Sequence, residues 1–282
     1  MANILIMGCG DLGGAAGGVL AAAGHTVWGL RRQPEQIPQP IRPLHGDFAE
    51  PDALPALPAD VDTVYFIATP GEFTAAGYRR AFVDGLRNTL SALEQAHQQP
   101  RRIVFVSSTS VYGANDGRRV AENSPPAPAR FSGQLLLEAE NLLHQSPFAG
   151  VVVRFAGIYG PGREYLLRKV REGVRGQDEP PTWTNRIHRD DCVGLLTHLF
   201  HMRGPQPLYI GVDDHPALRH EVLAWLAQEM RLDPRGTPAV PAGAAHGKRC
   251  DNARLHQSGY RLHYPDYRAG YRALLGARGA RD

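Results

Sequence analysis

The chain has 282 residues, 43% of them hydrophobic, and a formal net charge of +3 at pH 7. This length predicts one large domain, or a large domain with a small appendage, and a sizeable core. The charge is mild and mixed along the chain, which argues against a nucleic-acid-binding surface. No apolar run approaches the length of a membrane span, and no basic segment with an apolar signal core stands at the N-terminus. We therefore expect a cytoplasmic protein with neither a nucleic-acid nor a membrane partner.

The three cysteines, Cys9, Cys192 and Cys250, are far apart in the sequence. They form no C-x-x-C pair, so the sequence indicates neither a disulfide framework nor a zinc site, and we predict no metal. Cys9 lies inside a glycine-rich stretch and is predicted to be a small packing residue. A redox role for this thiol is the alternative.

A glycine-rich loop between a strand and a helix is the strongest signal. The apolar residues 3–7 predict a strand, and a helix rich in small residues follows the motif Gly8-Cys9-Gly10-Asp11-Leu12-Gly13. In this context a G-x-G-x-x-G motif is typical of dinucleotide binding. Gly8 permits the tight turn, Gly10 lets the backbone approach a pyrophosphate, and Gly13 lets the helix pack on the sheet. The N–H groups of Asp11 and Leu12 are predicted to hold the phosphates; the alternative is a helix entry without a ligand.

The end of the second predicted strand indicates which cofactor binds. NAD-binding units usually place an acidic residue about 20 residues past the glycines, where it bonds the ribose 2′-hydroxyl. No acidic residue lies between Asp11 and Glu35, while Arg31 and Arg32 follow the strand. A guanidinium at this point suits a 2′-phosphate, so we favour NADP over NAD. The alternative is that the two arginines are solvated loop charges.

Apolar runs and amphipathic stretches then alternate along the chain. The runs lie at residues 41–44, 63–67, 103–106 and 151–155, and the stretches include residues 77–97 and 132–144. This alternation predicts an α/β fold with a Rossmann-type, doubly wound parallel sheet. We interpret residues 1–155 as the dinucleotide-binding Rossmann domain. Residues 156–282 are interpreted as mostly a small C-terminal substrate lobe, with some segments returning to the core and a proline-rich loop at 234–247.

Besides the glycine loop, several short segments occur in a characteristic order. They are His45-Gly46-Asp47-Phe48 and the segments at 64–68, 105–113, 154–163 and 185–191. In order and spacing they resemble those of an atypical extended short-chain dehydrogenase/reductase of the NAD-dependent epimerase/dehydratase type. The resemblance covers nearly the whole chain.

The resemblance implies roles for particular residues. Asp47 is expected to contact the adenine, with Phe48 beside it, and further cofactor contacts are expected from Cys9, Ile67, Ala68, Thr69 and Ser107. Residues 159–163 and His188 are expected to line the substrate side, and residues 209–212 to help build the C-terminal lobe. Members of this family often pair through two long helices, so a homodimer through 77–97 and 132–144 is expected.

The departures from the family pattern concern the chemistry. Ser108 occupies the position of the catalytic hydroxyl, but Ser132 stands where the family has Tyr and Leu136 where it has Lys. Phe82 replaces the Asn. A serine hydroxyl is too weak an acid to replace the phenol, and a leucine supplies no charge to lower its pKa. The proton is therefore expected to come from Tyr112, Tyr159 or His188, and His188 has the most suitable intrinsic pKa. Structural roles are the alternative for each.

Two functions remain open from the sequence. In the first hypothesis, the chain is an NADP-dependent oxidoreductase or epimerase that acts on a small polar metabolite, and Ser108 polarises a carbonyl or hydroxyl of that metabolite. Alternatively, it keeps the cofactor without catalysis and acts as a sensor or regulator. Arg154, Arg163 and Arg186 are candidates to hold an anionic group of the substrate, or else form structural ion pairs.

Overall fold

The computed structural model describes residues 1–174, 180–232 and 245–279. Its internal contacts divide the chain into two compact units. The first unit comprises residues 1–111, 126–154 and 193–209, and the second comprises residues 112–125, 155–192 and 210–282. Each unit is thus assembled from separate stretches of the sequence. Most of the loop predicted at 234–247 lies outside the described residues.

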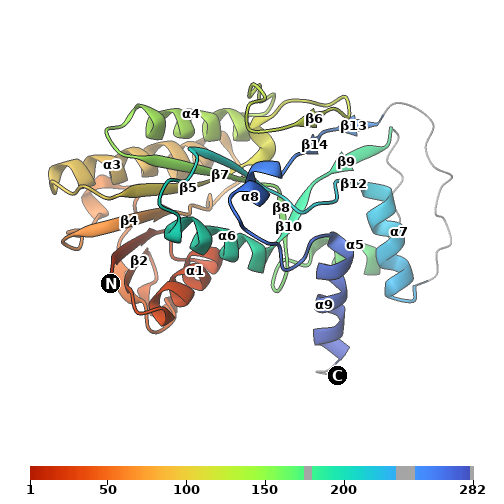
Figure 1. Ribbon diagram of the computed structural model, residues 1–282, viewed down its shortest axis with the longest axis horizontal. Helices are drawn as coiled ribbons and strands as arrows, with labels where there is room; N and C mark the ends of the chain where they lie inside the picture. Colours follow the sequence, from red (N-terminus) through yellow and green to blue (C-terminus); the bar gives the residue numbers. More distant parts are fainter. Residues whose placement is uncertain (175–179, 233–244, 280–282) are drawn as a thin grey trace. The chain divides into compact units, whose positions relative to one another are not determined.

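A seven-stranded parallel sheet forms the centre of the first unit, with only the ends of β7 and β11 assigned to the second (Figure 1). In spatial order the strands are β11 (Leu208–Gly211), β7 (Gly150–Phe155), β5 (Arg102–Ser108), β4 (Val61–Phe66), β1 (Asn3–Met7), β2 (Thr26–Arg31) and β3 (Arg42–His45). The chain builds outward from β1 to β3 and then crosses back to β4 beside β1. Ligands of doubly wound sheets bind at this kind of reversal. The predicted Rossmann-type fold is confirmed.

Helices cover both faces of this sheet (Figure 1). Helices α1 (Asp11–Ala22) and α6 (Arg189–His201) lie on one face, and α3 (Gly85–Gln95) and α4 (Phe131–Gln145) lie on the other. Because both faces are covered, central side chains such as Leu5 and Val64 have no exposed surface. The hydroxyl of Tyr65 in β4 is also buried, and it donates to the carbonyl of Leu196 in α6 at 2.9 Å. The predicted strands therefore read as nearly continuous apolar runs, as expected for a parallel sheet.

The helix predicted at 77–97 is interrupted. It consists of α2 (Ala75–Tyr78), the π-helical turn η3 (Arg79–Asp84) and α3, which ends at Gln95. A Cβ at Gly85 would stand 2.5 Å from the ring of Phe48, so the glycine lets that ring pack directly on the helix. π-Helical turns are rare and frequently lie at functional sites. The stretch predicted at 132–144 forms α4 without interruption.

Residues 209–212, which were expected to help build the C-terminal lobe, are shared between the two units: residues 210–212 are assigned to the second unit, but β11 joins the central sheet. Residues Leu208–Gly211 are β11, which lies at the edge of the central sheet beside β7. The Val152 N–H of β7 donates to the carbonyl of Pro207 at 2.9 Å. Without this added strand, the buried β7 would leave a row of backbone groups unpaired.

The second unit consists, among its described residues, of short strands and helices. The strands pair as β8 (Gly157–Tyr159) with β10 (Arg186–His188), β9 (Thr182–Thr184) with β12 (Ala217–Leu218) and β13 (His246–Gly247), and β6 (Arg119–Val120) with β14 (Arg249–Cys250). The helices are α5 (Tyr165–Arg171), α7 (Arg219–Glu229), α8 (Ala253–Gln257) and α9 (Tyr267–Gly279). Three-residue 3₁₀ turns also occur along the chain, at Pro34–Gln36, Pro51–Ala53 and Thr109–Val111.

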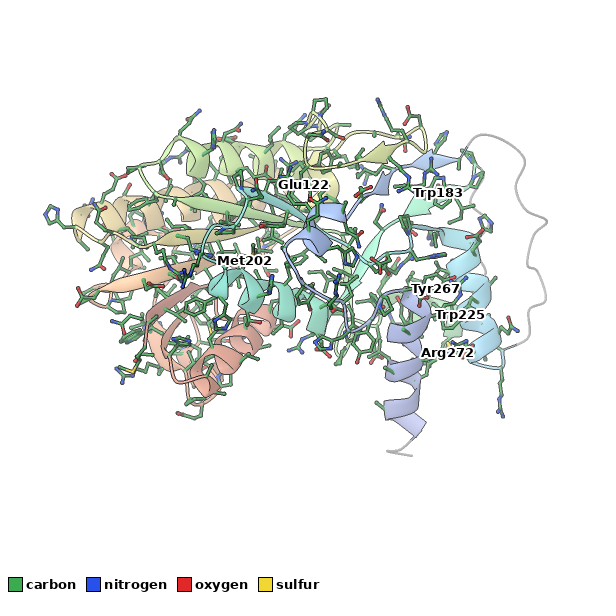
Figure 2. All side chains as sticks on the ribbon, viewed as in Figure 1. Glu122, Trp183, Met202, Trp225, Tyr267 and Arg272 are labelled. Carbon is green, nitrogen blue, oxygen red and sulfur yellow. The ribbon has the colours of Figure 1, made fainter. Side chains whose placement is uncertain are left out.

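An aromatic core holds the second unit together. Figure 2 shows Trp225 of α7 beside Tyr267 and Arg272 of α9; the rings of Trp225 and Tyr267 meet edge to face at 5.4 Å. Tyr159 stacks on Tyr271 at 4.4 Å. A Cβ at Gly270 would lie 2.0 Å from the Tyr159 hydroxyl, so α9 needs a glycine to pack this closely. No helix among the described residues is long and apolar enough to cross a membrane.

Candidate functional site

A pocket of about 540 Å³ lies in the first unit, where the carboxyl ends of β1, β2, β3 and β4 converge. Residues predicted for a dinucleotide supply much of its lining: Gly8, Cys9, Gly10, Arg31, Arg32, Asp47, Phe48, Ile67 and Thr69. Small residues after β4, Gly71, Ala76 and Gly77, and the charged residues Glu72 and Arg80 contribute to the rest. The structure thus brings most of the predicted cofactor-binding residues, which come from the ends of four strands, around one cavity.

The glycine loop fits a dinucleotide for steric reasons. Gly8 has φ +91°, and a Cβ there would lie 2.3 Å from the carbonyl oxygen of Ile67. A Cβ at Gly13 would lie 2.7 Å from the carbonyl oxygen of Gly8. A Cβ at Gly10, by contrast, would meet nothing within 4 Å, so the backbone here is open to a ligand. This pattern of two closely packed glycines and one exposed to the pocket is what pyrophosphate binding requires.

Hydrogen bonds hold the loop on β2. The N–H groups of Gly8 and Cys9 donate to the carbonyl of Leu30 at 3.2 and 3.0 Å. Asp11, Leu12 and Gly13 then form the first turn of α1, where the leading N–H groups of a helix have no intrahelical acceptor. These residues are outside the pocket lining, but their helix begins at its wall.

Cys9 behaves as the packing residue that was predicted. Its side chain is fully buried, and a Cβ at Gly29 of β2 would stand 2.5 Å from its Sγ. Burial raises the pKa of the thiol to about 11. The thiolate required for redox chemistry is therefore scarce near neutral pH.

The cationic side of the pocket includes one residue that sequence reasoning missed. Arg31 is half-buried and donates to the Gln36 side chain, while Arg32 is exposed. Arg80, in η3, donates to the Asp47 carboxylate at 3.2 Å and pairs with Glu50 at 3.0 Å. A π-helical turn shifts the helix register, so no periodicity argument could place Arg80 at the pocket. The signal available was an arginine near the start of a helix that follows β4.

Ser107 belongs to a buried charged cluster between β5, β7 and α4. Its hydroxyl donates to Glu140 of α4 at 2.5 Å, and Glu140 also forms an ion pair with Arg154 of β7. All three side chains are at most 6% exposed. Neither Ser107 nor Ala68 contributes to the pocket lining, and Arg154 is held by Glu140 as a structural ion pair.

The residues that replace the family's catalytic groups are placed differently from one another. Ser108 ends β5 and is half-buried; its Oγ accepts the Ser110 N–H at 3.1 Å. No acceptor among the described residues takes the Ser108 hydroxyl proton, which is therefore available to a ligand. Ser132 and Leu136 of α4, and Phe82 of η3, are buried. They pack against the protein and supply neither an acid nor a cation.

The three candidate proton donors all belong to the second unit and are buried. Burial raises the pKa of Tyr159, whose hydroxyl lies 3.5 Å from the carbonyl of Asp266. His188 accepts the Asp190 N–H on Nδ1 at 3.2 Å, and burial lowers its pKa, so it is neutral near pH 7 with its proton on Nε2. That Nε2 has no partner among the described residues. Tyr112 is 2% exposed.

Two charged residues of the 185–191 segment, Asp191 and Arg186, have structural contacts. Asp191 accepts bonds from the Tyr260 hydroxyl and from the N–H groups of His263 and Tyr264, at 2.7 to 3.0 Å. Arg186 bonds Thr184 and lies over the ring of Tyr267 at 5.1 Å. Within the described ranges no group of three His, Cys, Asp or Glu side chains is placed to hold a metal ion.

The parallel sheet and the pocket at the reversal of its strand order define a Rossmann-type α/β protein. The chain belongs to the NAD dependent epimerase/dehydratase family, whose model matches residues 4–192.

Individual relatives differ in how much they share. Protein YeeZ of Escherichia coli strain K12 is 34% identical over 179 residues, which span 61% of this chain and 61% of that protein. The match thus covers less than two thirds of that relative's length. A 3-diazoavenalumate denitrifying reductase from Streptomyces is 25% identical over 263 residues, 86% of each chain. A solved structure from Methylobacillus flagellatus named for the same family is 40% identical, covers 98% of both chains and has a TM-score of 0.81.

Proposed function

We propose that this chain is a nicotinamide-dinucleotide-dependent oxidoreductase or epimerase that prefers NADP(H) and acts on a small polar metabolite. The observation that carries the proposal is the pocket at the ends of β1 and β2, with open backbone at Gly10 and two arginines, Arg31 and Arg32. Family membership and the Streptomyces reductase support a redox or epimerase reaction. A guanidinium at the end of β2 supports the phosphorylated cofactor, because it can bond a 2′-phosphate bidentately.

The chain's own residues then have definite tasks. A bound nicotinamide cofactor supplies hydride transfer. Gly8, Gly10 and the first turn of α1 hold the pyrophosphate, and Asp47 and Phe48 hold the adenine. Ser108, whose Oγ is fixed by the Ser110 N–H, directs its proton toward a substrate oxygen and so stabilises negative charge there. His188 is neutral, so the N–H at its Nε2 would donate a hydrogen bond to a substrate oxygen rather than transfer its proton.

The test is calorimetric titration with NADPH and, separately, with NADH. We expect NADPH to bind more tightly, and the double variant Arg31→Ala/Arg32→Ala to lose about tenfold to a hundredfold in NADPH affinity, since a charge-assisted contact contributes about 1.5–3 kcal/mol. NADH affinity should change little. The matched control is Arg118→Ala/Arg119→Ala, which removes two adjacent exposed arginines that form ion pairs with Asp116 and Asp251. Binding of neither nucleotide by the wild type would overturn the proposal.

A cofactor-binding regulator is the second candidate, favoured by one observation. In α4, Ser132 and Leu136 occupy the positions where the family has a tyrosine and a lysine, and both side chains are buried. A regulator that reports the redox state must bind the reduced and oxidised cofactors with different affinities. Calorimetry with NADPH and NADP⁺ measures this difference, and equal affinities would remove the regulator from consideration.

A further inference from the structure

The second unit contains an unusual cation. The sequence has two lysines, Lys169 and Lys248, against a background of arginines. Lys169 lies on α5 and pairs with Glu172 at 2.6 Å. Lys248 is half-buried between β13 and β14, and no carboxylate among the described residues forms an ion pair with it. A partly desolvated ammonium without a counter-ion is costly, so its placement calls for an explanation.

The backbone on either side of Lys248 is tightly fixed. On one side, the Gly247 N–H donates to the side-chain oxygen of Asn115 at 2.9 Å. The carbonyl of Gly247 accepts the Gly117 N–H, also at 2.9 Å. On the other side, the Arg249 N–H donates to the carbonyl of Arg118 at 2.9 Å. The Asn185 side chain donates to the carbonyl of Lys248 at 2.9 Å and accepts the Cys250 N–H at 2.7 Å. The backbone at Lys248 is thus held by two segments, residues 115–118 and Asn185, rather than carried on a free loop.

The two residues that flank Lys248 in the sequence are themselves closely packed. Gly247 has φ +77°, and a Cβ there would lie 2.4 Å from the carbonyl oxygen of Trp183. Arg249 lies over the Trp183 ring at 5.2 Å and donates to the carbonyl of Gly117 at 2.7 Å. Figure 2 shows Trp183 on β9, next to the segment that carries Lys248. These contacts fix the backbone on both sides of Lys248 and so limit where its side chain can reach.

The ammonium itself is only partly satisfied. Its Nζ donates to the carbonyl of Tyr112 at 2.8 Å, and Tyr112 is the fourth residue after Ser108 in the sequence. Burial lowers the pKa of Lys248. An ammonium has three N–H donors, and this contact uses one of them. The two others have no acceptor among the described residues.

We propose that Lys248 binds an anionic oxygen group, a carboxylate or a phosphate, of the ligand that the second unit receives. An anion would supply both the missing counter-charge and the missing acceptors. That this ligand is the enzyme's substrate rests on the function proposed above. Of the three arginines expected for this task, Arg154 is paired with Glu140, and Arg186 bonds Thr184 and lies over the ring of Tyr267.

Acylation of the wild-type protein with N-hydroxysuccinimidyl acetate, a neutral amine reagent, tests the proposal without any variant. Peptide mass spectrometry gives the reaction rates of Lys248 and Lys169 separately. Acetate and inorganic phosphate serve as probes, with chloride at equal ionic strength as the reference. We expect at least one probe to slow acylation of Lys248 several-fold and saturably, with Lys169 unaffected. The probe that protects identifies a carboxylate or a phosphate. Equal protection at both lysines, no protection, or no reaction at Lys248 overturns the proposal.

Variants give an independent measurement. A ligand that binds only the folded state raises the melting temperature, so the effective probe should stabilise the wild type relative to chloride. Lys248→Met should lose this increment, Lys248→Arg should keep part of it, and the control Lys169→Met should keep all of it. An increment that survives Lys248→Met assigns the anion to another residue and contradicts the proposal.

The outcome is separable from that of the proposed function. NADPH calorimetry on Lys248→Met should match the wild type, because the pocket described above belongs to the first unit and does not include this residue. If the wild type bound no dinucleotide but Lys248 were still protected by an anion, the proposed function would fail and the anion site would stand.

Discussion

At the scale of single residues, the glycine loop has the strictest steric requirements. Gly8 combines φ +91° with backbone so close that an added Cβ would lie 2.3 Å from the carbonyl oxygen of Ile67. Gly8→Ala should therefore lower the free energy of unfolding by about 1–3 kcal/mol, the usual cost of a strained backbone position. Urea unfolding measures this change. Gly18 lies on α1, and a Cβ there would meet no atom within 4 Å. Gly18→Ala should therefore raise the free energy of unfolding by about 0.5–1 kcal/mol. Equal effects of the two substitutions would contradict this steric explanation.

A second residue-scale prediction concerns pH. Burial raises the pKa of Asp213 from 3.8 to about 8. Between these values the folded state holds a proton that the unfolded chain has lost, so stability falls as the pH rises through this interval. Asp213→Asn removes the titration while keeping an acceptor for the His215 N–H. Its unfolding free energy should fall less steeply with pH than that of the wild type.

Urea unfolding at a series of pH values measures the two slopes. Asp116→Asn, at an exposed carboxylate bonded to Arg118, is the control and should keep the wild-type slope. If Asp213→Asn kept it too, the carboxyl of Asp213 would not be the titrating group.

At this scale, the sequence predicts the role of a residue when that role follows from the residue's own backbone conformation. Gly8, Gly10 and Gly13 were predictable because their roles follow from the lack of a Cβ in a local strand–turn–helix. Arg80 and Lys248 were not, since each owes its position to contacts with segments distant in sequence, such as Asp47 and Tyr112. Ser107 was expected to contact the cofactor because of the family resemblance, and in the structure its hydroxyl donates to Glu140.

At the scale of elements, a buried ion pair ties α4 to the sheet. Glu140 of α4 accepts from Arg154 of β7 and from Ser107 of β5, all three being almost fully buried. Glu140→Gln should lower the free energy of unfolding by about 3–5 kcal/mol, because it leaves the Arg154 charge buried without its carboxylate. Chemical denaturation measures the loss.

The same helix supplies the control. Glu138 is two residues away and pairs with Arg79 at 2.8 Å, but both side chains are largely exposed, at 40% and 49%. Glu138→Gln should cost no more than about 1 kcal/mol. Comparable losses in the two variants would mean that burial does not decide the strength of these ion pairs.

Elements themselves were predicted well where hydrophobic periodicity determines them. The strands of the parallel sheet and α4 followed from apolar runs and amphipathic spacing. The π-helical turn η3 was not predicted. One extra residue in a turn leaves the spacing of apolar residues in the sequence close to that of an ordinary amphipathic helix. The position of β11 also escaped prediction: a short apolar strand carries no mark of the sheet it joins, and here the free edge of β7 decides it.

At the scale of the whole molecule, the first unit presents an apolar surface on α4. Leu137 and Leu142, both half-buried, line a shallow hollow together with Pro128 and the polar side chains of Gln134, Glu138, Asn141 and Gln145. Phe73, 70% exposed, lies in contact with Phe131 at the start of the same helix. This is one of the two helices through which pairing of two chains was expected, and apolar side chains exposed among polar ones are typical of a protein–protein interface.

We therefore predict a homodimer that dissociates when this surface is charged. Sedimentation velocity should show the wild type at twice the monomer mass, and Leu137→Glu should shift it toward the monomer, because a carboxylate buried at an interface without a partner is strongly unfavourable. Val19→Glu makes the same kind of change at an apolar α1 side chain that is 51% exposed, and it should leave the dimer intact. A wild type that sediments as a monomer at all concentrations would contradict the prediction. Dissociation by Val19→Glu alone would place the interface on α1 instead.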